Sequence, residues 1–480
     1  MRKLWKLAAV TGVAVAVGTM TSIGSAFATP PTGYGFDDSP HVVVGGGSDT
    51  TYQAQLGLTQ LYMSTSIAGC QHITTQGPTL DQCTPTVSAE TDTNLGDYEG
   101  DTFAQANPVG SSAGVGSLNG AVAGITEPGS VHPTNITCPN STVVTTTGPN
   151  VDFARSSRAP KLTGANSACS GNELDIDTFW GYAQDGVQVI AFDLQRGGEL
   201  QAQASPSLSP QQLFNIWNCA GGTGTGGRIR WSDLIPSLAG TARGNVDVVP
   251  WGMNSSSGTF ATFQSYITNN ATGVPSGWSP DGQTCDRKLT SGLFPLENDV
   301  KGPLNDPATL STDPSSADNP DNWIWWGSFG AMGAFPFLSN FTRGGTTFNA
   351  TASPVNGILP SSSGVIANTY PIGRTLYHVT LKRDADCPKT GGVCDFVGNP
   401  GPALPTSGTD LNVAGGTGGV SGAVREYTRF LCRLSAAQQG LNPYTGINNF
   451  SEITTRINNS GFTVVPSGLR TAGSRCQVLS

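Results

Sequence analysis

Charged side chains are scarce in this sequence: Lys, Arg, Asp and Glu together make up 12% of its 480 residues. The 33 acidic residues outnumber the 24 basic ones, so the formal net charge is -9 at pH 7. The phosphate backbone of nucleic acids and anionic lipid surfaces both repel a chain of this sign. The charge balance therefore argues against nucleic acid and anionic membranes as partners.

Histidine is scarcer still. The 4 His residues lie far apart in the sequence, and none of the 10 Cys residues belongs to a Cys-x-x-Cys pair. Because ligands at zinc-site spacing are lacking, we expect no metal site and no other cofactor. The even number of cysteines instead fits disulfides in an oxidising compartment. Sequence order suggests the pairs Cys70–Cys83, Cys138–Cys169, Cys219–Cys285, Cys387–Cys394 and Cys432–Cys476, although sequence does not fix connectivity.

Long apolar runs are also missing after residue 28, where nothing approaches the ~20 apolar residues that a membrane span needs. Residues 1–28 themselves fit an export signal, with Arg2 and Lys3 at a basic start and an apolar stretch at Leu7–Val17. Small residues predict cleavage near Ala28, and no Cys follows there to take a lipid. We therefore expect a soluble extracytoplasmic protein, in a periplasm or secreted to the cell exterior.

Small hydroxylated side chains, by contrast, are abundant at expected helix starts. Val246–Ile267 predicts a strand, a loop and a helix, because its apolar side chains change from a β-branched run to helical spacing. Ser257, Gly258 and Thr259 fall where that helix begins, so its unpaired N–H groups and positive dipole end would face the loop. This is either an anion site or an ordinary serine-capped helix.

The same unit occurs near residue 50. A short apolar strand at His41–Val44 runs into a Gly/Ser/Thr loop, and a helix follows through Leu56–Tyr62. Glycine lets the backbone approach a ligand closely, and hydroxyl or carboxylate side chains can cap the helix or contact a ligand. The candidate residues of this loop are Asp49, Thr50, Thr51 and Tyr52.

A third candidate helix start is Gly110–Gly114, in which Ser111 and Ser112 supply hydroxyls. The pentapeptide also fits the G-x-S-x-G turn of hydrolases, with Ser112 as the nucleophile. That alternative needs a base, and only His132 and His378 follow in the chain. The segment before the turn is polar, so we expect no strong strand there.

Val151–Arg158 predicts a short strand that ends in two Arg interleaved with two Ser: Arg155, Ser156, Ser157 and Arg158. Guanidinium groups bind tetrahedral oxyanions as planar forks, so these residues are candidate ligands. The alternative is that both arginines are solvated surface residues.

Two lobes are expected, because about 450 residues after the signal exceed the size at which a single core stops growing. Val187–Phe192 and Thr369–Val379 predict apolar strands that cross between the lobes. The Trp- and Phe-rich segment Asn322–Leu338 predicts a buried helix in the second lobe.

Five motifs, taken in their order along the chain, resemble the phosphate-binding proteins of bacterial ABC importers. The resemblance implies an α/β fold of the type II periplasmic binding protein kind, with a ligand cleft between two lobes and, here, disulfide-tied insertions at 66–108 and 128–149. The motifs are GSDTTY (47–52), GSSAG (110–114), DFARSSRAP (152–160), SSSGTFATFQSYI (255–267) and YPIGRTLYHV (370–379).

On this resemblance, residues 29–189 and 375–480 form lobe 1 and residues 190–374 form lobe 2, after a signal peptide at 1–28. The implied function is capture of inorganic phosphate, or a similar tetrahedral oxyanion, for ABC-type uptake. The implied protein is a monomer and no enzyme. An ABC permease would be its partner, although the sequence leaves open whether one exists.

The resemblance also assigns site residues position by position. A hydroxyl falls on Thr51, with a neighbouring backbone N–H on Tyr52. Further donors fall on Ser111 and on Ser257–Thr259.

Two charged positions of that family differ in this sequence. The carboxylate that accepts the phosphate proton falls on Ser157, and the arginine before the third loop falls on Met253. We hypothesise that Asp49 supplies the acceptor and that Arg155 or Arg158 supplies the cation, because each lies within a matched motif.

Two other functions stay open from the sequence. An exported protein with the same fold and a structural or adhesive role fits the missing charges, the missing lipid anchor and the extra cysteines. A secreted phosphatase or serine hydrolase fits the turn around Ser112.

Overall fold

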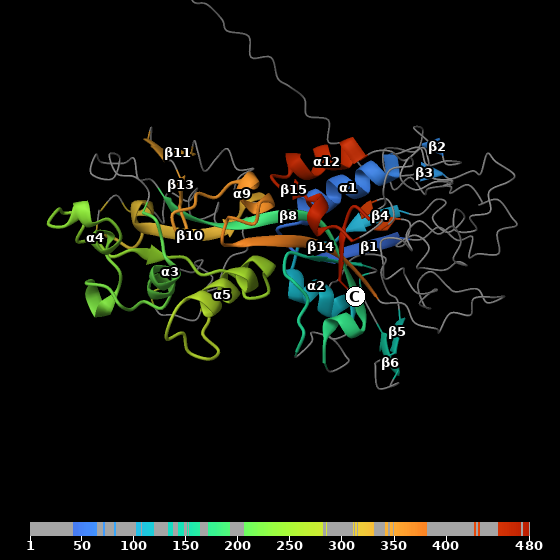
Figure 1. Cartoon of the computed structure of the whole chain (residues 1–480), viewed down its shortest axis with the longest axis horizontal. Coiled ribbons are helices and arrows are strands. Elements are labelled where there is room, and N and C mark those ends of the chain that lie inside the picture. Colours follow the sequence, from blue (N-terminus) through green and yellow to red (C-terminus); the bar gives the residue numbers. More distant parts are fainter. Residues whose placement is uncertain are drawn as a thin grey trace, which may run out of the picture.

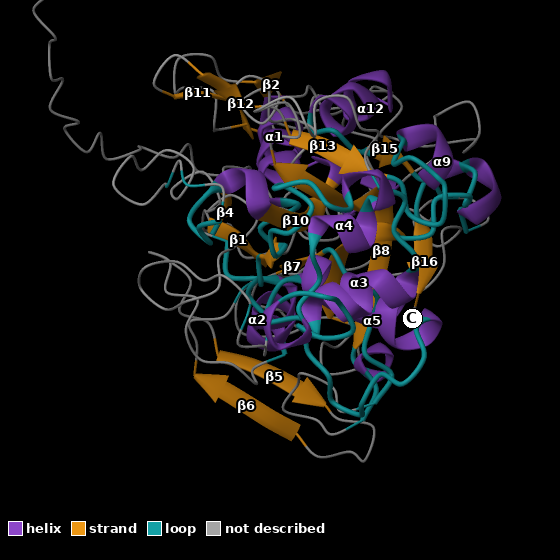
Figure 2. Ribbon diagram, turned by 90° about the vertical axis from the view of Figure 1, so that its left-hand side faces the viewer, coloured by secondary structure: helices purple, strands orange, loops and turns teal. Residues whose placement is uncertain are grey.

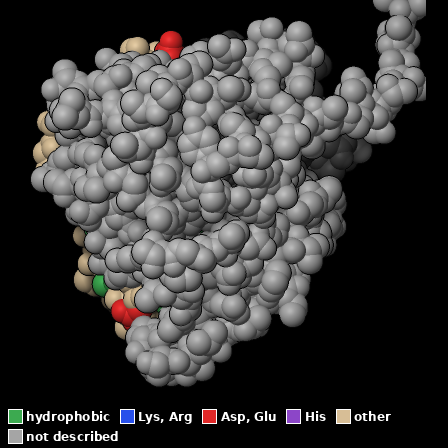
Figure 3. Space-filling view, turned by 90° about the vertical axis from the view of Figure 1, so that its right-hand side faces the viewer, with side chains coloured by type: hydrophobic (Ala, Val, Ile, Leu, Met, Phe, Trp, Pro, Cys, Tyr) green, Lys and Arg blue, Asp and Glu red, His purple; other side chains and the backbone are tan. Residues whose placement is uncertain are grey.

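The computed structural model describes most of the chain between residues 42 and 479, and all structural statements concern these residues. They are 42–64, 71–72, 81–82, 102–106, 108–119, 133–137, 143–147, 151, 153–163, 171–192, 206–281, 285, 311, 313, 315–330, 341–343, 346–348, 350–381, 427–428, 431–432, 450–471 and 474–479. The expected signal peptide lies outside them. Figure 3 shows mostly residues outside this list, and the site below involves none of those.

The fold is mixed α/β, as predicted. The strands of the main sheet are β1 (Val42–Gly47), β4 (Thr102–Gln105), β7 (Phe153–Ser156), β8 (Asp177–Phe192), β9 (Val249–Pro250), β10 (Trp323–Ser328), β13 (Ala350–Ser353), β14 (Gly373–Leu381), β15 (Thr463–Val464) and β16 (Gln477–Leu479). The α-helices are α1 (Tyr52–Ser64), α2 (Ser111–Leu118), α3 (Pro210–Trp217), α4 (Trp231–Leu234), α5 (Gly258–Asn270), α9 (Ser362–Ile366) and α12 (Phe450–Asn459).

The sheet has 10 strands, and its main path runs β4-β1-β7-β14-β8-β10-β9. In Figure 1, β8 and β14 run lengthwise through the middle of the molecule, with α1 and α12 above them and α2 and α5 below. Figure 2 shows the same two layers from the end, so helices cover both faces of the sheet. Separate hairpins are β2 (Gln71–His72) with β3 (Asp81–Gln82), β5 (Pro133–Thr137) with β6 (Val143–Thr147), and β11 (Phe341–Arg343) with β12 (Thr346–Phe348).

The first lobe is built on three parallel strands. β1 pairs in parallel with β4 on one side and with β7 on the other. Their carboxyl ends therefore meet at one edge of the sheet, which is where open α/β sheets bind ligands. β4 corrects our expectation that no strong strand precedes the Gly110 turn, since pairing with β1 stabilises a segment that looks polar in isolation.

β8 links the two halves of the sheet. It pairs with β14 in antiparallel register as far as Gly186, and with β10 from Val187 to Ala191. Both predicted crossing strands therefore exist, and β8 is longer than its apolar part suggested. The proposed lobe boundaries at residues 189 and 374 stay a prediction.

The second lobe packs around tryptophan. Phe263 of α5 stacks on Trp326 of β10, with ring centroids 4.6 Å apart and planes at 18°. Such offset aromatic pairs add to the stabilisation that burial of the rings supplies. The fully buried indoles of this core belong to Trp217, Trp231, Trp251, Trp323, Trp325 and Trp326.

The predicted helix over Asn322–Leu338 is wrong for Trp323–Ser328, whereas Phe329 and Gly330 are helical. Trp323–Ser328 is β10, and all six of its residues are buried. A strand with both faces covered has no alternation of polar and apolar residues, so its sequence is the same kind of apolar run that a buried helix shows.

Two of the five suggested disulfides fall within the described residues, and both are confirmed. Cys219–Cys285 and Cys432–Cys476 join α-carbons 5.9 and 5.0 Å apart. The first ties the end of α3 to the segment after α5, and the second ties a helical residue to the chain entering β16. The other three pairs lie outside the described residues.

Candidate functional site

Five buried hydroxyl groups from both lobes meet where three helices begin. Ser48 Oγ donates to Ser157 Oγ at 2.9 Å, and Ser111 Oγ lies 3.2 Å from the same Ser157 oxygen. Across the lobes, Thr50 Oγ1 lies 2.9 Å from Thr259 Oγ1. We call these five residues the hydroxyl cluster; each is at most 5% exposed.

Local sequence explains why the chain turns sharply enough to bring these residues together. Gly47 and Gly110 adopt φ values of 122° and 98°, which side chains other than glycine rarely adopt. A Cβ on Gly47 would also stand 2.5 Å from the Arg155 carbonyl oxygen. At the third turn, Ser257 caps α5 by accepting from the Thr259 N–H at 3.1 Å.

The two lobes touch directly at this cluster. Ser112 N–H donates to the Ser256 carbonyl at 3.3 Å. Gly258 comes so close that a Cβ there would stand 2.5 Å from Ser111 Oγ. The positive ends of α1, α2 and α5 converge on the same place, which favours a negative charge. Hydroxyl groups that here bond one another can turn to donate to an oxyanion when the lobes part to admit it.

Arg155, a candidate cation, is fully buried in the first lobe. Its guanidinium donates to the carbonyl oxygens of Gly45 and Ala106 at 2.9 and 3.0 Å, and also to the Gln105 side chain. Burial lowers its pKa to about 10, while the ring of Tyr52 and the carboxylate of Asp49 counteract this shift. Arg155 thus holds the carboxyl ends of β1 and β4 together, below the cluster.

Arg158, the other candidate cation, lies beside the cluster and is paired. It forms a bidentate ion pair with buried Glu173, at 2.8 Å to each carboxylate oxygen. Its Nε donates to Ser112 Oγ at 3.2 Å. Ser112 therefore lies at the edge of the cluster, in contact with a cation.

Arg374 is a cation that the sequence analysis missed. It rises from β14, donates to the Ser157 carbonyl at 3.1 Å and pairs with buried Asp185 of β8 at 2.6 Å. Its position within the YPIGRTLYHV motif was the available signal. Ser48 was missed too, although it directly precedes the four candidates of the same loop.

Of the other predicted residues in the first loop, Asp49 and Thr51 are buried and Tyr52 is half-buried. Asp49 is 7% exposed and lies close enough to Arg155 to raise the pKa of that guanidinium. Thr51 is fully buried, and its hydroxyl has no hydrogen-bond partner among the described residues. Tyr52 packs its ring against Arg155, with the guanidinium carbon 5.1 Å from the ring centroid.

The remaining positions are Ser156 and Met253. Ser156 Oγ donates to the Arg158 carbonyl at 2.8 Å and shapes the turn after β7. Met253 is fully buried in the core of the second lobe.

The hydrolase alternative needs His378 or His132 as the base for Ser112. His378 is fully buried on β14, where its Nε2 lies 3.0 Å from Thr428 Oγ1 and its ring 4.7 Å from that of Phe153. Burial lowers the pKa of His378 to about 3. Its ring therefore serves the core of the first lobe, and His132 lies outside the described residues.

Neither a metal site nor a membrane-spanning helix is found among the described residues. The described residues contain no group of three or more His, Cys, Asp or Glu side chains placed to hold a metal ion. None of their helices has the length and apolarity to cross a bilayer.

Comparisons with known proteins find a likeness in structure only. No protein-family model and no curated protein sequence matches the chain. A phosphate transport receptor from Vibrio cholerae is 14% identical, with 72% of this chain and 88% of that chain covered and a TM-score of 0.35. A possible phosphate-binding protein from Planctomyces limnophilus is 12% identical, with 90% and 95% covered and a TM-score of 0.36.

A putative phosphate ABC transporter substrate-binding protein from Clostridium perfringens, with bound phosphate, is also similar. It is 14% identical, with 71% of this chain and 86% of that chain covered and a TM-score of 0.35. These values are too low to carry a ligand or a partner over to this chain. The choice of ligand rests on the side chains described above.

Proposed function

We propose that this protein captures inorganic phosphate, or a similar tetrahedral oxyanion, outside the cytoplasm for uptake by an ABC permease. The observation that carries the proposal is the hydroxyl cluster, in which Ser48, Thr50, Ser111, Ser157 and Thr259 meet at three helix starts. No bond is made or broken in this function. The protein acts as a monomeric solute-binding protein, and its export signal is residues 1–28.

Binding would follow from the way in which the cluster spans the lobes. Thr50 and Thr259 belong to different lobes, and their hydroxyls bond each other in the closed arrangement. An oxyanion placed between them accepts hydrogen bonds from both sides, so each bond holds the lobes together. β8 and β14 are the strands that join the lobes and would bend as these open and close.

Selectivity would depend on Asp49. Phosphate carries a proton near pH 7 whereas sulfate carries none, so a carboxylate at the site accepts a hydrogen bond from phosphate and repels sulfate. Asp49 lies between Ser48 and Thr50, both members of the cluster, and is buried. Among the acidic residues that the structure describes, Asp49 is the one whose two sequence neighbours both belong to the cluster.

Calorimetric titration tests the proposal. Phosphate is titrated into protein that has been stripped by unfolding and refolded with its disulfides intact, and sulfate serves as competitor. We expect saturable one-to-one binding that sulfate does not displace. Asp49→Asn should lose the preference for phosphate, whereas Glu452→Gln, an exposed carboxylate on α12, should keep it.

Absence of heat with either anion, in protein shown to be folded by its circular dichroism, would overturn phosphate capture. An adhesive or structural role would then become the better account of the fold. An unchanged preference in Asp49→Asn would overturn only the role of that carboxylate.

A further inference from the structure

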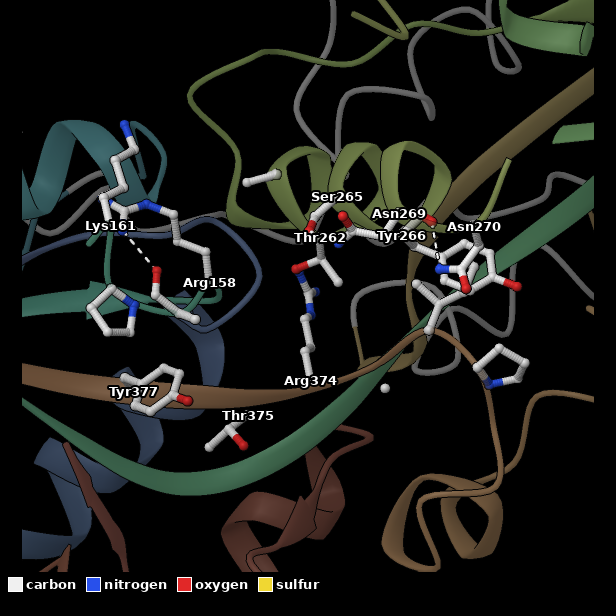
Figure 4. Close-up of a pocket in the computed structure, with 16 residues that line it drawn as sticks. Arg158, Lys161, Thr262, Ser265, Tyr266, Asn269, Asn270, Arg374, Thr375 and Tyr377 are labelled. Atoms are coloured by element: carbon white, nitrogen blue, oxygen red, sulfur yellow. Dashed lines mark hydrogen bonds between the residues drawn. The ribbon is translucent and has the colours of Figure 1, made fainter. Parts of the chain in front are cut away.

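A cavity of about 510 Å³ opens next to the hydroxyl cluster, between α5 and the strand β14. Figure 4 shows Arg374 rising from β14 in the middle of this cavity, towards Thr262 and Ser265 on α5. Two wall residues bond directly to the residues of the site: Arg374 to the Ser157 carbonyl at 3.1 Å, and Thr262 Oγ1 to the Gly258 carbonyl at 2.9 Å. Arg374 and Thr262 thus connect the cavity wall to the backbone of the neighbouring site, although no side chain of the hydroxyl cluster is among the lining residues.

Three cations line one end and the middle of the cavity. Arg158, Lys161 and Arg374 line it, and no carboxylate is among the residues that do. The partners of the two arginines, Glu173 and Asp185, are buried behind the wall. Burial, followed by the charge of Arg158, lowers the pKa of Lys161, and the carboxylate of Glu173 partly offsets this shift.

The other end is uncharged and polar. Figure 4 shows Tyr266, Asn269 and Asn270 there, on the same side of α5 as Thr262. Residues three and four apart lie on one helix face, so this wall follows α5 for about 10 Å from Thr262 to Asn269, at a rise of 1.5 Å per residue. The opposite face of α5 packs into the core of the second lobe through Phe260, Phe263 and Ile267.

The volume lies within the range of sites that bind small organic molecules, about 300–1,000 Å³. Inorganic phosphate, a single phosphorus with its oxygens, would leave most of this space to water. Amide, hydroxyl and phenol groups at the far end are suited to a partner that carries several hydroxyls. The arrangement of cluster, cations and polar wall matches an anionic head with a hydroxylated body.

We propose that the preferred ligand is a phosphate monoester of a polyhydroxylated alcohol, such as a sugar phosphate. Its phosphate group binds at the hydroxyl cluster beside Arg158 and Arg374, and its body lies along α5 as far as Asn269. This proposal rests on the proposed function, because the cluster must bind the phosphate group.

The test compares glucose 6-phosphate, inorganic phosphate and glucose by calorimetry on the refolded full-length mature protein. We expect glucose 6-phosphate to bind at least tenfold more tightly than phosphate, and glucose alone to give no saturable heat. Asn269→Ala should lower the affinity for the ester about five- to tenfold, the value of one lost hydrogen bond, and leave inorganic phosphate within twofold. Thr268→Ala, the exposed neighbour that does not line the cavity, is the matched control.

The outcomes separate the two proposals. Tight binding of phosphate with equal or weaker binding of the ester, or an ester affinity that Asn269→Ala leaves unchanged, would overturn the cavity as a ligand site and leave phosphate capture standing. Binding of the ester without any of phosphate would support the cavity and overturn inorganic phosphate as the ligand. A folded protein that binds neither would overturn both.

Discussion

Gly258 offers a direct test of the hydroxyl cluster, because this glycine of the second lobe lies against two cluster serines of the first. A Cβ there would stand 2.5 Å from Ser111 Oγ and would also collide with Ser157 Oγ. Non-bonded carbon contacts are most favourable near 3.5–4.0 Å, so Gly258→Ala forces the lobes apart by about 1 Å. The bond between Thr50 and Thr259, now 2.9 Å, would open to about 3.9 Å, beyond hydrogen-bond reach.

The expected loss of affinity follows from the bonds given up. Donors of the second lobe would stand about 1 Å too far from an oxyanion held by the first lobe. Each hydrogen bond to a charged group contributes about 1.5–3 kcal/mol, so the loss of two costs roughly 3–6 kcal/mol. We therefore expect phosphate to bind at least about 100-fold more weakly to Gly258→Ala, measured by calorimetry.

A matched glycine separates this effect from a general one. Gly57 lies inside α1, and a Cβ there would have Arg456 Cδ as its nearest neighbour, 3.8 Å away. Alanine is a better helix former than glycine by about 0.5–1 kcal/mol, so Gly57→Ala should raise the midpoint of thermal unfolding slightly and leave phosphate affinity unchanged. Wild-type affinity in Gly258→Ala would refute the cluster as the binding site.

Local signals made most of the first lobe and the helices of the second predictable. α5, for example, begins at Gly258 behind a capping Ser257, as the sequence indicated. These features depend on residues a few positions apart. The helix predicted in place of β10 was wrong because Trp323–Ser328 is extended through its pairing with β8 and β9, which lie far away in the sequence.

The positions of the charged side chains in the candidate site could not be predicted from local sequence either. The sequence places Arg155 and Arg158 three residues apart at the end of one predicted strand. In the structure, Arg155 donates to backbone carbonyl oxygens, whereas Arg158 forms an ion pair with Glu173. Arg374 gains its position from Asp185, which lies 189 residues away in the chain. Hydroxyl residues at helix starts were predictable because capping is local, whereas the distribution of cations depends on pairing across the sheet.

Two buried titratable groups give pH predictions of opposite sign, testable by urea unfolding of wild type, His378→Gln and Asp177→Asn from pH 4 to 6.5. Burial lowers the pKa of His378 to about 3, below the unfolded value of about 6.5, so its contribution to stability is present above pH 6.5 and is lost as pH falls. Burial raises the pKa of Asp177 well above 3.8, against the partial opposition of its bond from Asn119, so stability is lost as pH rises from 3.8. Each group changes the stability by at most about 1.4 kcal/mol per pH unit, and the two changes have opposite signs. Relative to wild type, His378→Gln should therefore lose stability with rising pH, and Asp177→Asn should gain stability. If the plots of unfolding free energy against pH were parallel for all three proteins, neither side chain would be held in a buried, uncharged form.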